Sequence, residues 1–197
     1  MSVYLKNVLA ASLVGLLANA AMAADGTINF TGEIIAASCS ATAGAGTTVG
    51  GEKGNQNIDV SLGKVSMDSL TGTAGGNIVA GSAINVNLDC GSTAAGLSTV
   101  RVQFDPMSGS GVDPKNNKLL KTTGTAKGVG IGIYNANNVP INLAANEFVD
   151  APMIKTGEAE TAKYTANLNM RAGYVANGDT MAPGTANGTL PFTLTYQ

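Results

Sequence analysis

A repeated alternation of apolar and polar residues over short segments constrains the fold more than any other feature of the sequence. In each segment, residues of one parity are apolar and those of the other are polar or small; the segments are 27–35, 57–63, 83–90, 99–104, 128–134, 163–170 and 189–196. A period of two puts successive side chains on opposite faces of a β-strand, so each segment predicts a half-buried strand. Turn-forming residues such as Asp105-Pro106 and Asn177-Gly178 separate the segments. The sequence therefore predicts an all-β chain folded as an antiparallel β-sandwich.

The composition agrees with strands joined by tight turns. Only 12% of the residues are charged and 5% are aromatic, whereas 26 residues are glycines. This balance favours strands over helices rich in Glu and Lys. The glycine-rich, polar stretch 44–57 is predicted to be a loop, and no change in composition along the chain indicates a second domain.

The first residues have the three parts of a secretory signal peptide. Lys6 provides a positive charge, residues 8–17 form an apolar run, and Ala21-Met22-Ala23 has the small residues of a cleavage site. The alternative, a membrane-spanning anchor, needs about 20 apolar residues, and this run is shorter. We therefore predict a signal peptide over 1–23, export from the cytoplasm, and a mature chain that starts at Ala24.

The mature chain is acidic and large enough for one domain. Removal of 23 of the 197 residues leaves 174, enough for a domain with its own core. Lys6 is the only charged residue in the removed segment, so 10 basic and 13 acidic residues remain and the formal charge is −3. Because the sequence has no basic patch, it predicts no nucleic-acid partner.

The chain has two cysteines, Cys39 and Cys90, and no histidine. In an exported protein an even number of cysteines favours a disulfide, because the periplasm is oxidising. Closing this loop is expected to stabilise the fold by roughly 4 kcal/mol. The alternative, a metal site with two thiolates, lacks further soft ligands. We predict no metal, no cofactor and no catalytic residue, since Ser-His-Asp and Cys-His catalysis both need a histidine.

The alternation is most regular at the start of the mature chain. The odd-numbered positions are polar, and the even-numbered ones are apolar or glycine: Gly26, Ile28, Phe30, Gly32 and Ile34. Such a strand buries one whole face and leaves the other in water. It is either the first strand of the chain's own sheet or a strand that inserts into another molecule, and periodicity alone leaves both possibilities open.

The carboxyl terminus shows the same pattern. Leu190, Phe192, Leu194 and Tyr196 alternate with a proline, two threonines and the final glutamine. No strand follows this segment, so we expect its edge to need a partner that pairs with it and covers the apolar face beside it. Either an earlier strand of the same chain or a strand from another molecule can supply that cover.

These segments together resemble the subunits of type 1-like fimbriae, the pilins of the chaperone–usher pathway, and the major subunit in particular. The resemblance covers essentially the whole mature chain. It rests on an aromatic-x-Gly-x-aliphatic motif before the first cysteine and on six further features: Val60-Ser61-Leu62-Gly63 with Leu70, the strand 84–90 that ends in Cys90, the Gly-Ile repeat 128–134, Tyr164, Gly184 at the fourteenth position from the end, and the penultimate Tyr196. There are two departures. Only Ala24 and Asp25 precede Gly26, and the gap between the cysteines is longer, which we place in 44–57.

The resemblance implies an incomplete immunoglobulin-like β-sandwich that lacks its last strand. It implies that residues 24–35 are a donor-strand extension and that residues 36–197 are the pilin domain. The donor side chains are then Gly26, Ile28, Phe30, Gly32 and Ile34. The edge of the groove that accepts a strand, first from a periplasmic chaperone and then from the next subunit, is then formed by Gly184, Leu190, Phe192, Leu194 and Tyr196.

The implied function is that of a structural subunit, not an enzyme, which polymerises by donor-strand exchange into a fimbrium on the bacterial surface and supports cell adhesion. The implied partners are identical subunits, the chaperone, an outer-membrane usher and a tip adhesin. Two alternatives remain open. One is a minor adaptor or tip subunit of the same kind of fibre. The other is a monomeric, secreted, carbohydrate-binding β-sandwich.

Overall fold

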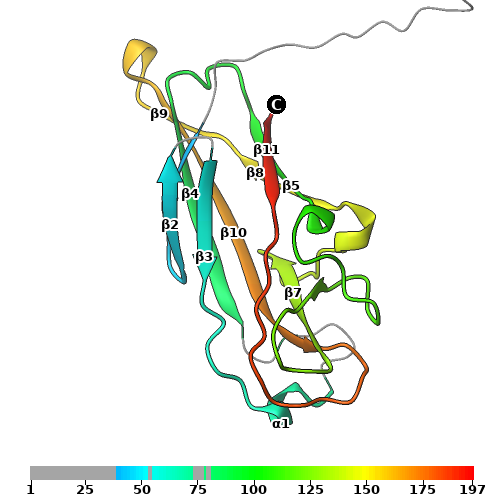
Figure 1. Cartoon of the computed structure of the whole chain (residues 1–197). Helices are drawn as coiled ribbons and strands as arrows, with labels where there is room; N and C mark the ends of the chain where they lie inside the picture. The colour runs from blue at the N-terminus through cyan, green and yellow to red at the C-terminus, as the bar shows by residue number, and fades with distance from the viewer. Residues whose placement is uncertain (1–38, 53–54, 73–77, 79–80) are drawn as a thin grey trace, which may run out of the picture. The chain divides into compact units, whose positions relative to one another are not determined.

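Figure 1 shows the computed structural model of the chain, which describes residues 39–52, 55–72, 78 and 81–197. The predicted signal peptide (1–23) and donor-strand extension (24–35) lie outside these residues, as do the first three residues of the predicted 36–197 domain. The described residues belong to one compact unit and consist mainly of β-strands.

The largest sheet is antiparallel and is built around β10, a strand of 14 residues. β10 pairs with β4 along one edge and with β7 and then β9 along the other. The order across the sheet is β1 (Ser40–Ala43), β4 (Ser82–Gly91), β10 (Lys163–Ala176), β7 (Val129–Asn135) and β6 (Leu120–Lys121), with β9 (Ile154–Thr156) beside β10.

A second antiparallel sheet packs against the same core. Its order is β11 (Phe192–Tyr196), β5 (Thr99–Phe104) and β8 (Phe148–Pro152). The core contains side chains from both sheets, with Val86 and Leu88 of β4, Val100 and Val102 of β5, and Leu168 of β10 all at most 2% exposed. The described part of the chain is thus a two-layer β structure with one main hydrophobic core.

The prediction of a loop over 44–57 is wrong. A hairpin of β2 (Thr47–Glu52) and β3 (Asn55–Val60) occupies most of it. Thr47, Thr48 and Val49 are β-branched and favour extended backbone, which outweighs the glycines around them. The glycines indicated a loop where the structure has a strand.

Four of the other predicted strands are confirmed with shifts at their ends. β4, β5, β7 and β10 cover the segments 83–90, 99–104, 128–134 and 163–170. β10 continues six residues beyond its predicted end because β7 pairs with that extension. β11 begins at Phe192 rather than at 189, since the N–H of Thr189 bonds to Ser110 Oγ and its C=O to the N–H of Ser110.

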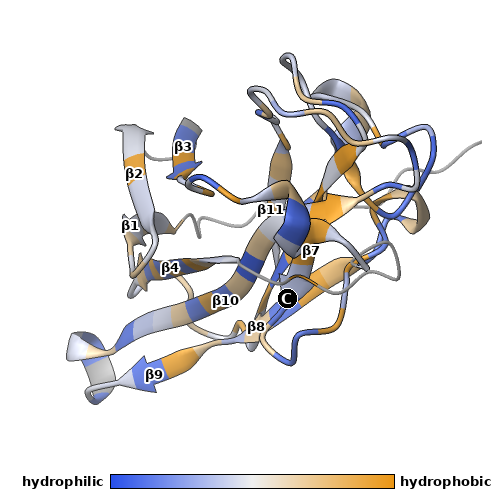
Figure 2. Ribbon diagram, turned by 90° about the horizontal axis from the view of Figure 1, so that it is seen from below, coloured by the Kyte–Doolittle hydropathy of each residue, from blue (hydrophilic) through white to orange (hydrophobic). Residues whose placement is uncertain are grey.

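β7 is buried on both faces, and its glycines are part of the packing. Figure 2 shows hydrophobic colouring along its ribbon. Ile131 and Ile133 face the main core, whereas Tyr134 joins a second small cluster with Leu119 and Val175. A Cβ on Gly132 would lie 2.8 Å from the Tyr134 ring. The repeat 128–134 is therefore a packed strand.

The helical segments are short turns between strands, namely α1 (Met67–Leu70), η2 (Pro106–Ser108), η3 (Leu143–Ala145) and η4 (Ala159–Thr161). Among the residues that the structure describes, none of the helices has the length and hydropathy required to cross a bilayer.

Candidate functional site

β11 is an edge strand, paired with β5 on one side only. Thr99 and Gln197 exchange two backbone hydrogen bonds of 2.9 Å each. In an antiparallel ladder such pairs recur at every second residue, so the N–H and C=O groups of Phe192, Leu194 and Tyr196 point to the opposite edge. Within the described residues no strand pairs with that edge (Figure 1).

The same three residues of β11 carry the side chains that face the core. Phe192, Leu194 and Tyr196 are half-buried, and the threonines between them are exposed. Their neighbours in β5 are far better covered: Phe104, Val102 and Val100 are 8%, 1% and 0% exposed. The apolar face of β11 thus lies on the core with part of its surface uncovered, beside an edge whose backbone groups point outward.

A second half-covered apolar row starts in β3. Ile58, Val60 and Leu62 are half-buried and pack against the same core, while the residues between them are exposed. β3 pairs only with β2 among the described strands, and no pairing joins it to β11. In Figure 1 both β3 and β11 lie in front of β10. The core is therefore bordered by two strands with incompletely covered apolar side chains.

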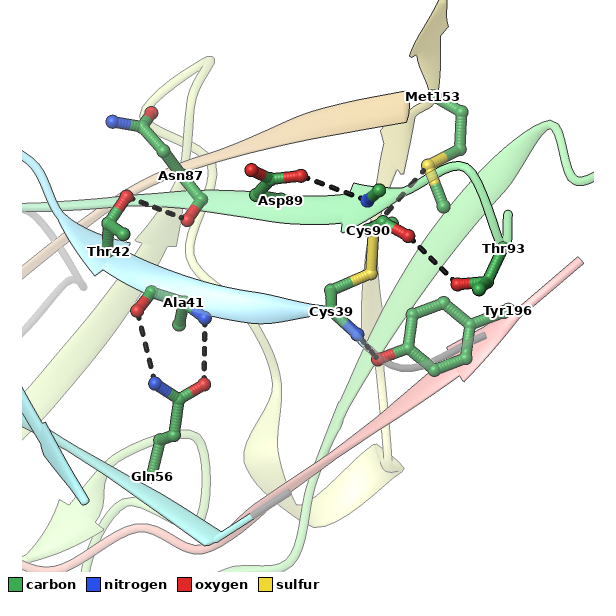
Figure 3. Close-up of a disulfide and its surroundings, with 11 residues drawn as sticks. Cys39, Ala41, Thr42, Gln56, Asn87, Asp89, Cys90, Thr93, Met153 and Tyr196 are labelled. Carbon is green, nitrogen blue, oxygen red and sulfur yellow. Dashed lines mark hydrogen bonds between the residues drawn. A yellow bond between two sulfur atoms is a disulfide. The ribbon is translucent and has the colours of Figure 1, made fainter. Parts of the chain in front are cut away.

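The end of β11 is joined to the start of β1 next to a disulfide (Figure 3). Cys39 and Cys90, which are 4% and 1% exposed, form the predicted bond and link the residue before β1 to β4. The N–H of Cys39 donates to the hydroxyl oxygen of Tyr196 at 3.2 Å. The Tyr196 side chain thus holds the end of β11 against the end of the large sheet that carries the disulfide.

Gly184 lies apart from the other residues predicted for this edge. It precedes β11 and packs against Thr125 and the N–H of Ala126, where a Cβ would clash with backbone. The segment around it is anchored by Tyr174, whose hydroxyl donates to the carbonyl of Ala186 at 2.7 Å. The structure therefore brings together, on one face, Leu190, Phe192, Leu194 and Tyr196. Gly184 lies instead in the segment that precedes them.

The outer face of the second sheet carries one ion pair. Arg101 donates to both carboxylate oxygens of Asp150 at 2.8 and 2.9 Å, and its guanidinium lies 3.5 Å from the centre of the Phe148 ring. The hydrogen bond from Arg101 lowers the pKa of Asp150, and the same bond raises the pKa of Arg101. Asp150 is exposed and Arg101 is only partly covered, so the pair organises the surface and adds little to stability.

No group of three or more acidic residues, cysteines or histidines that could hold a metal is found in the described part of the chain. The five predicted donor positions, Gly26, Ile28, Phe30, Gly32 and Ile34, lie outside the described residues, so the structure does not place them. Sequence reasoning assigned no site role to Ile58, Val60 and Leu62. Their alternation was visible, but only their partial burial beside the same core reveals them as a second border.

Comparisons with known proteins find fimbrial proteins among those that the chain resembles. A family profile described as "Fimbrial protein" matches residues 28–197. The chain is 31% identical to long polar fimbria protein A of Salmonella typhimurium, over 95% of this chain and 93% of that protein. It is 29% identical to a type-1 fimbrial protein subunit of Serratia marcescens, over 96% of each chain.

The fold has a counterpart among solved structures. A chain from a chaperone–usher pilus structure matches with a TM-score of 0.52 and 21% identity, over 88% of this chain and 96% of that one. At this identity the match concerns the fold alone. It supports the two-layer β architecture described above.

Proposed function

The chain belongs to the fimbrial protein family, and from this membership we propose that it polymerises head to tail by inserting a β-strand of one copy into the next. The family consists of structural proteins, so the chain is a building block and not an enzyme. In this proposal it is the major subunit of a chaperone–usher pilus, and its place is the filament on the cell surface.

The proposal rests on the unpaired edge and the half-covered side chains of β11. Its backbone donors and acceptors at Phe192, Leu194 and Tyr196 point to an edge with no described partner, and the side chains of the same residues are only half-covered. An added strand satisfies both needs at once, because its backbone completes the ladder and its alternate side chains cover the core. In this proposal the fold is an immunoglobulin-like sandwich that is one strand short.

The incoming strand in this proposal is the segment 24–35 of a neighbouring copy. Its even positions are Gly26, Ile28, Phe30, Gly32 and Ile34, so one face is wholly apolar or small. Burying each large side chain contributes about 1.5–3 kcal/mol. This apolar face would pack between two borders of the core. One is β11, and the other is formed by Ile58, Val60 and Leu62. Since donor and acceptor are different surfaces, the contact is heterologous and builds an open filament.

Before assembly the same edge requires protection. An unpaired strand with an apolar flank is prone to aggregate, and a periplasmic chaperone that lends a strand to β11 would prevent this. Residues 1–23 direct export in this proposal, and the disulfide between Cys39 and Cys90 forms in the oxidising periplasm. An outer-membrane usher then replaces the chaperone strand with that of the next subunit. A tip adhesin terminates the fibre.

Deletion of residues 25–34 tests the proposal. The shortened subunit should accumulate with its chaperone but give no heat-dissociable, denaturant-resistant ladder of multimers on gels. Phe30→Asp should act like the deletion, because it places a charge on the buried face. Asn29→Asp adds the same charge to the opposite face and serves as the matched control, with normal ladders expected. Normal fibres from the deletion variant would contradict strand exchange through this segment.

A further inference from the structure

Three sulfur atoms lie together beside the end of β11 (Figure 3). Two belong to the disulfide, and the third is the thioether of Met153, whose Sδ is 3.9 Å from Cys90 Sγ. At the other half of the bond, Cys39 donates its N–H to the Tyr196 hydroxyl. The disulfide is thus in contact with Met153 at Cys90 and with the last strand at Cys39.

The backbone of Met153 is tied to the end of the chain. Met153 is the one residue between β8 of the second sheet and β9 of the large sheet. Its N–H donates to the carbonyl of Ser98 at 2.8 Å, and the N–H of Ser98 donates to the carbonyl of Gln197 at 2.6 Å. A displacement of Met153 would therefore affect both the disulfide and the end of β11.

Partial burial distinguishes Met153 from two other methionines. Met107 is 74% exposed, whereas Met170 is 6% exposed and belongs to the core. Met153 is half-buried: its side chain packs against the core, and the residues on either side of it, Pro152 and Ile154, are exposed. A small solute therefore has access to part of this side chain, and a chemical change there alters the packing against the core.

This environment suits a thioether and does not suit a sulfoxide. Oxidation converts the apolar methionine side chain into a polar one with a strong acceptor oxygen. The Thr93 hydroxyl, which lies beside the disulfide in Figure 3, already donates to the carbonyl of Cys90 at 3.0 Å. Burying an oxygen without a hydrogen-bond donor is unfavourable, so the oxidised side chain would turn toward water and lose its contact with Cys90.

We propose that Met153 is an oxidation site, and that its sulfoxide opens the disulfide to attack by thiols. Hydrogen peroxide supplies the oxygen atom: the S–O bond forms as the O–O bond breaks, the sulfur is oxidised by two electrons, and water leaves. With Met153 displaced, an external thiolate attacks Cys90 Sγ and releases the thiolate of Cys39. A second thiol then releases Cys90 from the mixed disulfide. The proposal rests on the disulfide and does not depend on strand exchange.

The full-length protein, purified in its folded and disulfide-bonded form, provides the test. It is treated with hydrogen peroxide, catalase removes the excess, and mass spectrometry of its peptides identifies the methionines that have gained an oxygen. Dithiothreitol is then added, and the free cysteines are alkylated and counted over time. Peroxide should oxidise Met153 and make reduction of the disulfide about tenfold faster, as expected when an oxygen without a donor weakens local packing.

Three variants separate the role of Met153 from general oxidation. Met153→Leu removes the oxidisable sulfur at similar volume, so peroxide should leave its rate of disulfide reduction unchanged. Met107→Leu is the matched control, because it removes an exposed sulfur, and it should respond to peroxide as the unaltered protein does. Met153→Gln introduces a polar side chain and should be reduced about tenfold faster without peroxide.

The proposal is overturned if Met153 gains no oxygen under conditions that oxidise Met107. It is also overturned if peroxide accelerates reduction of the Met153→Leu variant as much as that of the unaltered protein. Equal reduction rates for Met153→Gln and the unaltered protein would be a third contradiction, because a polar side chain would then leave the disulfide as well protected as before.

Discussion

Gly132 lies in the middle of β7, and the ring of Tyr134 occupies the space where its side chain would be. The sequence predicted a strand here from the alternation of glycine and isoleucine, and that prediction is confirmed. Why glycine is needed was beyond sequence reasoning, because the Tyr134 ring folds back over its own strand and joins Leu119 and Val175. Periodicity indicates which face a residue occupies, but it does not reveal which neighbour fills the space above it.

Replacing Gly132 by alanine should destabilise the subunit by about 1–3 kcal/mol, the usual effect of overpacking a filled core. The added Cβ would lie 2.8 Å from two atoms of the Tyr134 side chain, which would have to move. Gly50→Ala is the matched control, because Gly50 is also in a strand and has no neighbouring atom within 4 Å of an added Cβ. Thermal unfolding of the purified subunit–chaperone complexes distinguishes the two. Equal midpoints would contradict this account of the repeat.

β2 is the strand that sequence reasoning missed, whereas β3 overlaps the predicted strand 57–63. One side chain attaches the β2–β3 hairpin to the large sheet. Gln56 accepts from the N–H of Ala41 at 2.7 Å and donates to its carbonyl at 3.1 Å. Ala41 pairs with β4 on its other side, so the Gln56 amide takes the position of a further strand on the edge of β1 (Figure 3). An interaction between residues 15 apart through a side-chain amide leaves no periodic signal, whereas the glycines and polar residues of 44–57 indicated a loop.

Gln56→Ala should release the hairpin from β1, at a cost of about 1–3 kcal/mol for two hydrogen bonds. The measurement is hydrogen exchange of the Ala41 amide and of the β2–β3 backbone, which should become faster than in the unaltered subunit. Asn57→Ala is the control, since Asn57 is the next residue and its exposed side chain has no hydrogen bond to another described residue. If exchange at Ala41 were the same in both variants, the Gln56 amide would not be holding the hairpin.

At the scale of the whole molecule, the two-layer all-β architecture and the disulfide were predictable, and the open edge was predictable in part. Alternation up to Tyr196 indicated a final strand that needs a partner. It could not indicate that Ile58, Val60 and Leu62 would form the opposite border, because partial burial depends on which strands meet the core. Alternation also could not indicate that Gly184 lies apart from the residues of β11. That depends on the path of the segment before β11, which Tyr174 anchors through Ala186.

A chain that carries the strand proposed to complete its fold should be a stable monomer. Residues 25–35 are added after Gln197 through a flexible linker, and the original copy before Cys39 is removed. Because the added strand is intramolecular, its effective concentration is high and the edge of β11 should be closed without a partner. Urea unfolding should then be cooperative, and sedimentation should show a single species. The same chain with Phe30→Asp in the added copy should remain unstable; equal stability of the two would contradict the proposed role of that face.

The covalent link between Cys39 and Cys90 has a mechanical consequence for a filament under tension. If residues 24–35 act as the proposed donor strand, a pull on them that reaches Cys39 passes through the sulfur atoms directly into β4, the second strand of the large sheet. The 51-residue separation between the cysteines is thereby withheld from stretching. At full extension such a length would add roughly 170–180 Å to every subunit. In a reducing environment each subunit could therefore extend by this additional length before the fibre broke.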